Sequence, residues 1–233
     1  MAEPTLWQAK RGARTVRGEQ RRTALLAAAE KVFREAAYDD VRVADIVEAA
    51  GTSHGTFYKY FSSKEAVFQA LVAQLQDELL GRTSSEWAGE RGGDATDGHA
   101  GARRASLLDR IEAGNRRYLE VFKRYANIMV TVEYSRAPQL QQLQTDFRNS
   151  FVDRVARRIS RWQDEGLIDG GIDPYYAAHA LGGMVSRFAY VSHVLGEQFD
   201  AERAVQQLTR LWANALQLDE RKPSPSRGRR AKH

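Results

Sequence analysis

A short stretch of the sequence, residues 54–60, concentrates side chains that can bind an anion. It reads HGTFYKY and carries three hydroxyl groups and a cation, on Thr56, Tyr58, Lys59 and Tyr60. On the outer face of one short helix these groups would suit phosphate oxygens and the edges of bases in a DNA major groove. Ser53 is a good N-cap for that helix and joins the candidate contacts. These residue types predict binding to nucleic acid.

The segments around this stretch have the layout of a helix-turn-helix. Residues 43–50 (VADIVEAA) follow a helical pattern that stops at Gly51, and a turn of about three residues leads into the second helix. Small or apolar side chains would let the two short helices pack closely, namely Ala44, Ile46, Val47, Ala50 and Phe57. The alternative is an ordinary helical hairpin with a mixed surface.

Two longer helices are predicted on either side of this motif. Apolar residues at helical spacing predict one over about 19–36. The other is expected to start at Ser62, which as N-cap would form a capping box with Glu65. Together with the two short helices they form a predicted domain over residues 19–80.

Both ends of the chain are basic, although the net charge is only +5. Residues 1–24 and 219–233 each carry six Lys or Arg against two acidic residues. Basic arms commonly meet a polyanion. We therefore expect a flexible arm over 1–18 and a disordered tail over 219–233; a merely solvated arm is the alternative. The candidates for phosphate or minor-groove contacts are Arg14, Arg17, Arg21 and Arg22.

The string AAGTSHGTFYKYFSSKEAVF resembles the N-terminal signature of TetR/AcrR-type bacterial transcriptional regulators, over about residues 19–80. The resemblance implies a homodimer in which each subunit has a three-helix DNA-binding domain and a larger domain for a small effector and for dimerisation. By position, Thr56 and Lys59 resemble residues that approach bases, and Tyr58, Tyr60 and Lys64 resemble phosphate contacts. Arg42 stands where the family often has Thr; it would reach phosphate but cap the helix poorly.

The remainder of the chain also reads as helical, so the predicted fold class is all-α. Residues 81–105 hold six glycines and few apolar residues, and are predicted to be a linker. The predicted C-terminal domain over 106–218 would bind the effector and hold the dimer together. Within it, Asp173 and Pro174 set up one helix start and Asp200 caps another.

Aromatic and charged residues in otherwise apolar runs of this domain are candidates for an effector pocket. They are Tyr118, Phe122, Met129, Glu133, Phe147, Phe151, Trp162, Arg187, Phe188 and Tyr190. Ordinary core packing is the alternative for each aromatic residue, and a structural ion pair is the alternative for Glu133 and Arg187. The pocket would take an apolar or amphipathic molecule.

Two segments near the C-terminus, about 174–196 and 200–217, are predicted to form the dimer interface. The first is apolar on most sides and carries small residues that permit close helix approach. The residues expected at the interface are Ala178, Gly182, Gly183, Leu208 and Trp212. A central helix of a monomeric bundle is the alternative.

Several other functions are disfavoured by what the sequence lacks. The absence of cysteine excludes a disulfide framework, a thiol nucleophile and a zinc ribbon. His179 and His193 would lie about 21 Å apart on one helix and could not share a metal. We expect no metal, no cofactor, no catalytic residues, no membrane span and a cytoplasmic location.

The sequence predicts a dimeric, ligand-responsive repressor of a palindromic operator. An all-helical enzyme or carrier and a nucleoid-type DNA binder are the alternatives.

Overall fold

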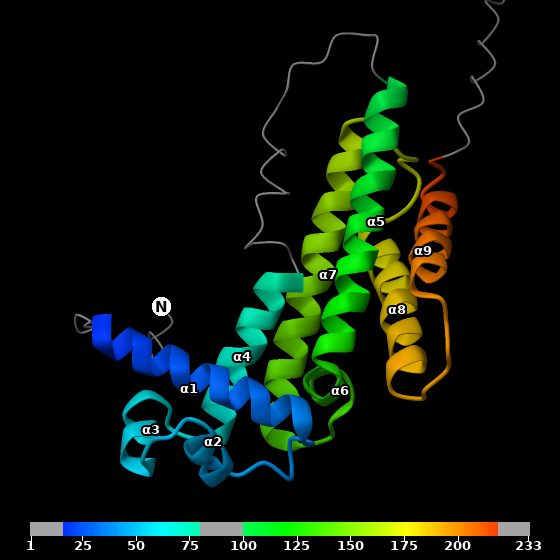
Figure 1. Ribbon diagram of the computed structural model, residues 1–233. Coiled ribbons are helices and arrows are strands. Elements are labelled where there is room, and N and C mark those ends of the chain that lie inside the picture. The colour runs from blue at the N-terminus through cyan, green and yellow to red at the C-terminus, as the bar shows by residue number, and fades with distance from the viewer. Residues whose placement is uncertain (1–15, 80–99, 219–233) are drawn as a thin grey trace, which may run out of the picture. The chain divides into compact units, whose positions relative to one another are not determined.

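The computed structural model describes residues 16–79 and 100–218, and every regular element in those ranges is helical (Figure 1). The all-α prediction is therefore confirmed for that part of the chain. The predicted arm up to residue 15, with Arg14, lies outside the described residues, as do residues 80–99 and the predicted tail 219–233. The elements are α1 (Val16–Glu35), α2 (Val43–Ala49), α3 (His54–Tyr60), α4 (Lys64–Leu79), α5 (Ala100–Arg124), α6 (Ala126–Tyr134), the 3-10 helix η3 (Pro138–Leu140), α7 (Gln141–Asp164), α8 (Pro174–His193) and α9 (Ala201–Ala215).

The chain divides into two compact units. The first comprises residues 1–75 and 127–144, and the second comprises residues 76–126 and 145–233. The predicted domain over 106–218 is therefore interrupted, because most of α6 and all of η3 belong to the first unit. A side chain from α6 makes one of that unit's internal contacts: Asn127 Nδ2 donates a hydrogen bond to the backbone oxygen of Arg34 at 2.9 Å.

The first unit has an aromatic core formed by residues far apart in the sequence. The ring of Phe33 at the end of α1 stacks on Tyr38 with centroids 5.8 Å apart, and both rings meet Phe68 of α4 edge-on at 5.0 and 4.8 Å. Phe57 of α3 is fully buried and packs on Phe61, just after that helix. The burial of Phe57 shows that the apolar face of α3 packs inside the unit, where α3 lies against α2.

Two predicted helix starts in the first unit were wrong by a few residues. The α1 helix reaches back to Val16 rather than 19, so Arg17 lies on a helix and not in an arm. The α4 helix begins at Lys64, because Ser63 and not Ser62 caps it: Ser63 Oγ accepts a hydrogen bond from the Ala66 backbone at 3.2 Å. The predicted capping box of Ser62 and Glu65 is absent.

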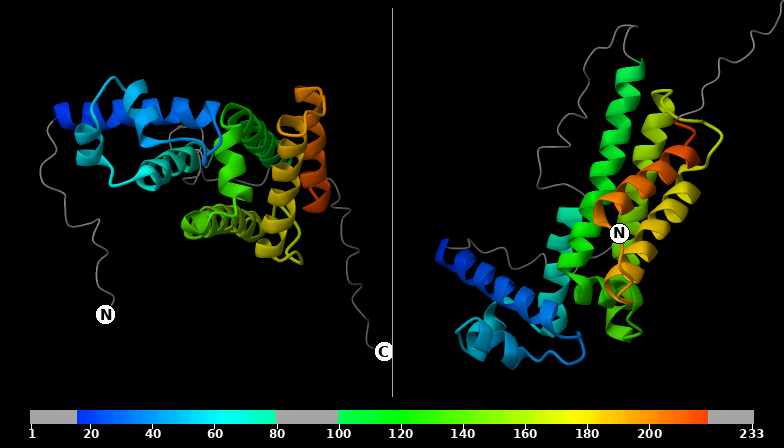
Figure 2. Two further views of the ribbon diagram at one scale, coloured as in Figure 1. Left: turned by 90° about the horizontal axis from the view of Figure 1, so that it is seen from below. Right: turned by 45° about the vertical axis from the view of Figure 1, so that its right-hand side comes forward.

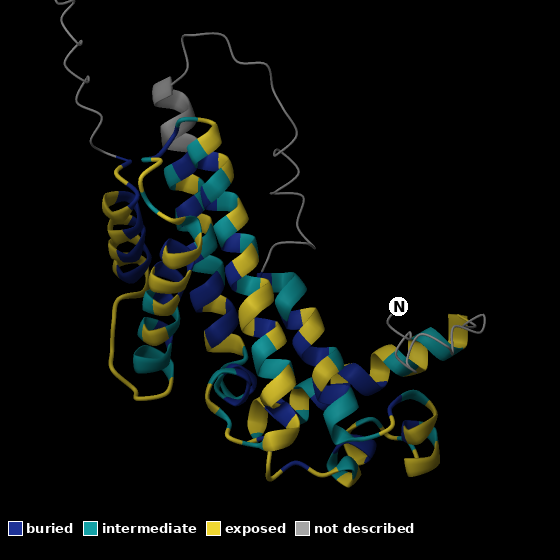
Figure 3. Ribbon diagram, turned by 180° about the vertical axis from the view of Figure 1, so that it is seen from behind, coloured by how far each residue is buried: buried dark blue, intermediate teal, exposed yellow. Residues whose placement is uncertain are grey.

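The second unit is built from α5, α7, α8 and α9, with α8 and α9 both packed against α5 (Figure 2). Asp173 and Asp200 cap α8 and α9 as predicted, with hydrogen bonds from backbone N–H groups at 2.8 and 2.7 Å. The α9 helix is amphipathic, with separate buried and exposed faces (Figure 3). The predicted linker is wrong at its C-terminal end, because α5 begins at Ala100.

Candidate nucleic-acid interface and ligand cavity

The turn between α2 and α3 is held by backbone hydrogen bonds. The Ala50 N–H donates to the Ile46 oxygen at 2.9 Å, and the Thr52 N–H reaches back to the Val47 oxygen at 3.1 Å. Between them Gly51 adopts a φ of +58°, a left-handed conformation that suits glycine. The helix-turn-helix predicted from sequence is confirmed in its two helices and in its turn.

The first turn of α3 is ordered by its own side chains. Ser53 Oγ accepts a hydrogen bond from the Thr56 backbone at 3.2 Å and lies 3.1 Å from the Thr56 hydroxyl. The Thr56 oxygen keeps at least one lone pair for a bond from a ligand, whichever of the two hydroxyls donates to the other. The first role of Ser53 and Thr56 is therefore to fix the helix that carries the other candidates.

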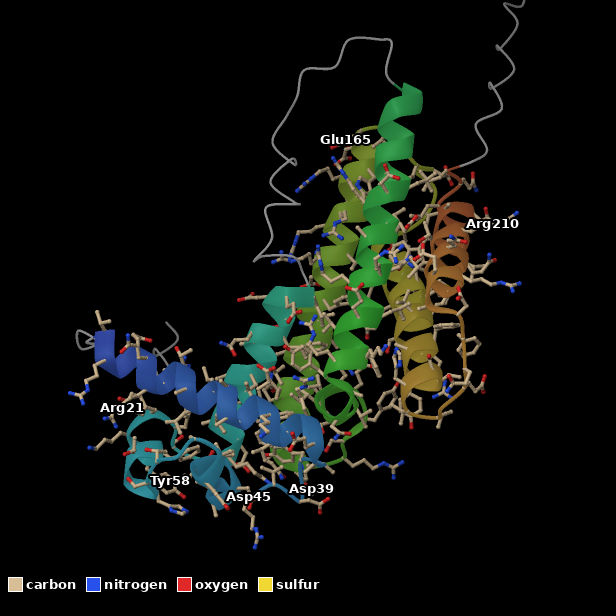
Figure 4. The ribbon with its side chains drawn as sticks, in the orientation of Figure 1. Arg21, Asp39, Asp45, Tyr58, Glu165 and Arg210 are labelled. Atoms are coloured by element: carbon tan, nitrogen blue, oxygen red, sulfur yellow. The ribbon has the colours of Figure 1, made fainter. Side chains whose placement is uncertain are left out.

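The outer face of α3 presents the residues predicted to meet DNA. Tyr58 is 55% exposed and Lys59 is exposed, whereas Thr56 and Tyr60 are half-buried. The Tyr58 ring also meets the edge of the buried Phe57 ring, with centroids 5.4 Å apart, which restrains it. Figure 4 labels Tyr58 on this helix and shows its side chain projecting outward. A cation and a hydroxyl thus stand on a fixed backbone in solvent.

Arg42, the residue before α2, has a side chain that is 82% exposed. An arginine offers no acceptor for a helix N-terminus, and α2 is instead stabilised by Asp45, which accepts a hydrogen bond from the Arg42 backbone N–H at 2.7 Å. The guanidinium stays 3.9 Å from the same carboxylate. The expectation of poor capping is confirmed, and the Arg42 side chain is accessible to an anion.

Two other candidate cations make contacts inside the first unit. Lys64 Nζ donates a hydrogen bond to the Tyr38 backbone oxygen at 2.8 Å and lies 4.2 Å from the centre of the Tyr38 ring. The Arg22 guanidinium lies 5.2 Å from the centre of the Phe61 ring. Arg17 and Arg21 are exposed on α1, where Figure 4 labels Arg21. Arg17 and Arg21 are therefore accessible to an anion, whereas Lys64 and Arg22 lie over aromatic rings of the first unit.

The tyrosine beside Lys64 has a strongly perturbed acidity. Burial, followed by the charge of Glu65, raises the pKa of Tyr38 well above its ordinary value of 10. The Tyr38 hydroxyl donates to Glu65 Oε1 at 3.1 Å. Backbone hydrogen bonding to the carboxylate lowers the pKa of Glu65, an effect that burial partly offsets. Tyr38, Lys64 and Glu65 therefore link the α1–α2 segment to α4, and this cluster was not anticipated from sequence.

A cavity that opens to solvent lies among the helices of the second unit. Three of the predicted pocket residues line it: Tyr118 from α5, and Phe151 and Trp162 from α7. The full lining is Leu79, Arg110, Ile111, Gly114, Asn115, Tyr118, Phe151, Arg154, Val155, Arg158, Trp162, Gly182, Val185 and Trp212. Part of the predicted set thus lines a cavity, and its role as an effector pocket stays a prediction.

The other predicted pocket residues lie elsewhere. Met129 and Glu133 belong to the first unit, on α6. Phe122 and Phe147 are buried without lining the cavity. Arg187 lies over the Tyr190 ring, 5.1 Å from its centre, and Phe188 packs on Phe199 beside a second opening. The spacing of aromatic residues predicts which face of a helix is buried. Which of these buried side chains line the cavity depends on the neighbouring helices.

Sequence reasoning missed three arginines that line the cavity, Arg110, Arg154 and Arg158. It also missed the buried Asn115, whose Nδ2 donates to Thr209 Oγ1 at 3.2 Å and so joins α5 to α9. The signal available was the pair Arg154 and Arg158, one helical turn apart on either side of Val155 and in the same stripe.

Most of the predicted interface residues are buried within the single chain. Ala178, Leu208 and Trp212 are all buried, and Trp212 lines the cavity. Gly182 is buried too: a Cβ added there would lie 3.3 Å from Phe151 Cε1. Gly183 alone of the five is exposed, and an added Cβ would meet no atom within 4 Å. Of the five residues, Gly183 is thus the one accessible on the subunit surface, and the interface itself stays a prediction.

Within residues 16–79 and 100–218, no three His, Cys, Asp or Glu side chains gather as metal ligands would. In those same ranges no helix has both the length and the apolar character of a membrane span.

Comparison with known proteins places this geometry in a family. Residues 25–71, from α1 through the helix-turn-helix into α4, match the model of the bacterial regulatory proteins of the tetR family. The HTH-type transcriptional regulator EthR of Mycobacterium tuberculosis is 27% identical over 214 residues, which cover 88% of this chain and 92% of EthR.

Two solved structures share the fold. NalD, the secondary repressor of the MexAB-OprM multidrug efflux pump in Pseudomonas aeruginosa, superposes with a TM-score of 0.61 at 20% identity, covering 87% of this chain and 98% of NalD. The transcriptional regulator FadR from Bacillus subtilis, in complex with stearoyl-CoA, gives 0.65 at 16% identity, covering 82% and 96%. With a formed helix-turn-helix and these relatives, residues 25–71 are a DNA-binding domain of the tetR family, and the chain is a helix-turn-helix transcriptional regulator.

Proposed function

We propose that the protein is a repressor that binds a palindromic DNA operator as a homodimer in the cytoplasm and is released by a small-molecule effector. The observation that carries the proposal is the exposed pair Tyr58 and Lys59 on a short helix fixed by the buried Phe57. In the major groove, Lys59 donates to acceptors on base edges, and the Tyr58 hydroxyl bonds to phosphate.

Further cations supply contacts to the DNA backbone. Arg42 stands in solvent before α2, and Arg17 and Arg21 stand on the exposed side of α1. Each phosphate neutralised by such a cation releases counterions, so the affinity should depend steeply on salt. Lys64 has a lesser role in this proposal, because its ammonium group is already bonded to Tyr38.

A homodimer is supported by an exposed stripe on α8. Tyr176, Ala180, Gly183 and Arg187 are exposed at a spacing that places them on one helix face. Tyr176 is 75% exposed, and the middle of the stripe is small enough for two helices to approach closely. The α9 helix adds Leu211, which is 50% exposed on an otherwise polar face. These residues replace the buried ones in the proposed interface.

The effector is proposed to bind in the cavity of the second unit. A palindromic operator requires two recognition helices about 34–36 Å apart, so any change in the dimer that alters this spacing lowers affinity. An effector acts by binding more tightly to the conformer with the wrong spacing. Two structural neighbours, the repressor NalD and the regulator FadR in complex with stearoyl-CoA, favour this scheme over DNA binding without ligand control.

The proposal is tested by a mobility-shift titration of the full chain on the DNA upstream of its own coding sequence, over a series of salt concentrations. We expect tight binding to a near-palindrome and much weaker binding to a random duplex of equal length. Equal affinity for both duplexes would instead indicate a nucleoid-type binder. No binding to either would favour the carrier alternative.

A further inference from the structure

We propose that the effector is an apolar molecule with a carboxylate, held by the indole N–H of Trp212 and by the guanidinium groups of Arg110 and Arg154. This inference rests on the proposed function, since it names the chemical class of ligand that the cavity of the second unit takes. It is carried by one unpaired donor, by the charges of the lining and by the shape of the apolar wall.

The first observation is a buried hydrogen-bond donor that lacks a partner. Trp212 is 8% exposed and lines the cavity, and its Nε1 makes no hydrogen bond. An indole N–H can only donate, and a buried donor without an acceptor is costly. Most buried tryptophans avoid that cost by bonding to a nearby oxygen. An acceptor atom on a ligand would satisfy this one.

The second observation is the sign of the charges around the same cavity. Arg110 of α5 and Arg154 of α7 are half-buried, and neither forms an ion pair with another residue of the described ranges. No acidic side chain lines the cavity in the part of the chain described. Arginine pairs with carboxylates through two parallel hydrogen bonds. The uncompensated positive charge favours an anion over a neutral or cationic ligand.

The third observation is the apolar wall that would receive the body of the ligand. The Tyr118 and Phe151 rings lie edge-on, 5.9 Å apart, and Val185 of α8 completes this side. Gly182 keeps the wall open, because a Cβ there would meet the Phe151 ring at 3.3 Å. A slender acyl or aryl group fits such a wall.

A neutral apolar ligand is the competing possibility. The arginines would then line the cavity with their methylene stems only, and their charged heads would stay in water. Under that alternative, removal of the charge would leave ligand affinity unchanged. The two possibilities therefore differ in one measurable quantity, the preference for an anion over its neutral analogue.

The test is calorimetric titration of the full chain with dodecanoate and dodecanol, and with 4-phenylbutanoate and 4-phenylbutanol, all below micelle-forming concentrations. We expect at least one carboxylate to bind about tenfold more tightly than its alcohol, the effect of a charge-assisted hydrogen bond. The double variant Arg110→Gln/Arg154→Gln should lose that preference. Trp212→Phe, which removes the N–H donor together with part of the ring system, should weaken carboxylate binding at least about fivefold while binding of the alcohols changes less.

Arg157→Gln is the matched control, because Arg157 is exposed on α7 and does not line the cavity. It should bind the carboxylates like the wild type. Alcohols that bind as tightly as their acids, binding of neither acid, or an equal loss in Arg157→Gln would overturn the inference. Circular dichroism melting of each variant checks that the fold is retained. Operator binding by the ligand-free chain is measured separately, so failure of the repressor proposal is distinguished from failure of the carboxylate proposal.

Discussion

Lys64 Nζ donates a hydrogen bond to the backbone oxygen of Tyr38 at 2.8 Å, from the first turn of α4 to the segment that follows α1. The resemblance to the family implied a phosphate contact for this lysine. Its position beneath the Tyr38 ring, 4.2 Å from the ring centre, gives it a structural role in the first unit. An ammonium group has three hydrogens, so this contact leaves donors for DNA.

Replacement of this lysine should lower stability. Lys64→Met keeps most of the length of the side chain but removes the hydrogen bond and the charge over the ring, and should reduce the free energy of unfolding by about 1 kcal/mol. Urea denaturation followed by circular dichroism measures the change. Lys59→Met is the matched control, because Lys59 is exposed, and should be neutral within about 0.5 kcal/mol. Equal stability of Lys64→Met and wild type would contradict the structural role.

Stability at alkaline pH should depend on Tyr38. Burial and the Glu65 charge raise the pKa of Tyr38 in the folded state above the ordinary value of 10. A group with a raised folded pKa stabilises fully below its unfolded pKa, and the contribution is lost as pH rises through the folded value. The stability difference between wild type and Tyr38→Phe should therefore be constant from neutral pH to about 9 and shrink above 10. Denaturation at matched pH values checks this, and a difference that grows with pH would refute it.

The sequence was sufficient for the local structure of the DNA-binding unit. Its signals act within a few residues: Ser53 bonds to the backbone three residues on, and Gly51 takes the left-handed conformation that ends α2. The error at Ser62 has the same local origin, because two adjacent serines can both cap and only the observed start of α4 selects Ser63. Local rules predict that a helix begins, to within a residue or two.

The second unit was harder to predict because its site depends on which helix faces which. Gly182 and Gly183 are neighbours in sequence, but about 100° apart around α8, so one faces Phe151 and the other faces solvent. Both residues are glycine, so residue type alone does not tell which of them faces the interior of the subunit. Trp212 was likewise predicted on a surface, and it is buried against the cavity. Such assignments need the neighbouring helix, which no local pattern supplies.

Discrimination between operator and random DNA should depend on Lys59. If it donates to base edges, Lys59→Ala should lower the preference for the operator by about 1–3 kcal/mol. Tyr58→Phe removes a phosphate contact and should weaken binding to both duplexes similarly. Lys31→Ala removes the same charge from an exposed position on α1 and serves as the control. Competition titrations measure the preference, and an unaltered preference in Lys59→Ala would place α3 outside the groove.

Salt dependence should report on the basic arm. Deletion of residues 1–15 removes Lys10, Arg11 and Arg14 but leaves α1 whole from Val16. If these cations neutralise phosphates, the slope of log affinity against log salt should flatten by roughly 2–3 units, at about 0.9 per phosphate. A truncated chain with the wild-type slope would show that the arm is merely solvated. Operator titrations at several salt concentrations provide the measurement.

The two adjacent glycines of α8 should separate dimerisation from folding. Gly183→Leu places a large side chain in the middle of the exposed stripe, where the subunit itself offers no obstruction. It should weaken the dimer and lower operator affinity while leaving the stability of the subunit nearly unchanged. Gly182→Leu instead forces atoms against the Phe151 ring and should destabilise the subunit by about 1–3 kcal/mol.

Light scattering, thermal melting and operator titration on the same samples distinguish the two effects. The physical reason for a loss of operator affinity in Gly183→Leu is geometric: the variant changes no DNA contact, but it moves or separates two recognition helices that must span one turn of DNA. Its loss should therefore be large on the full palindrome and small on an isolated half-site. A Gly183→Leu dimer with wild-type operator affinity would exclude the α8 stripe as the interface. A wild-type monomer that binds the palindrome tightly would exclude the dimeric mechanism itself.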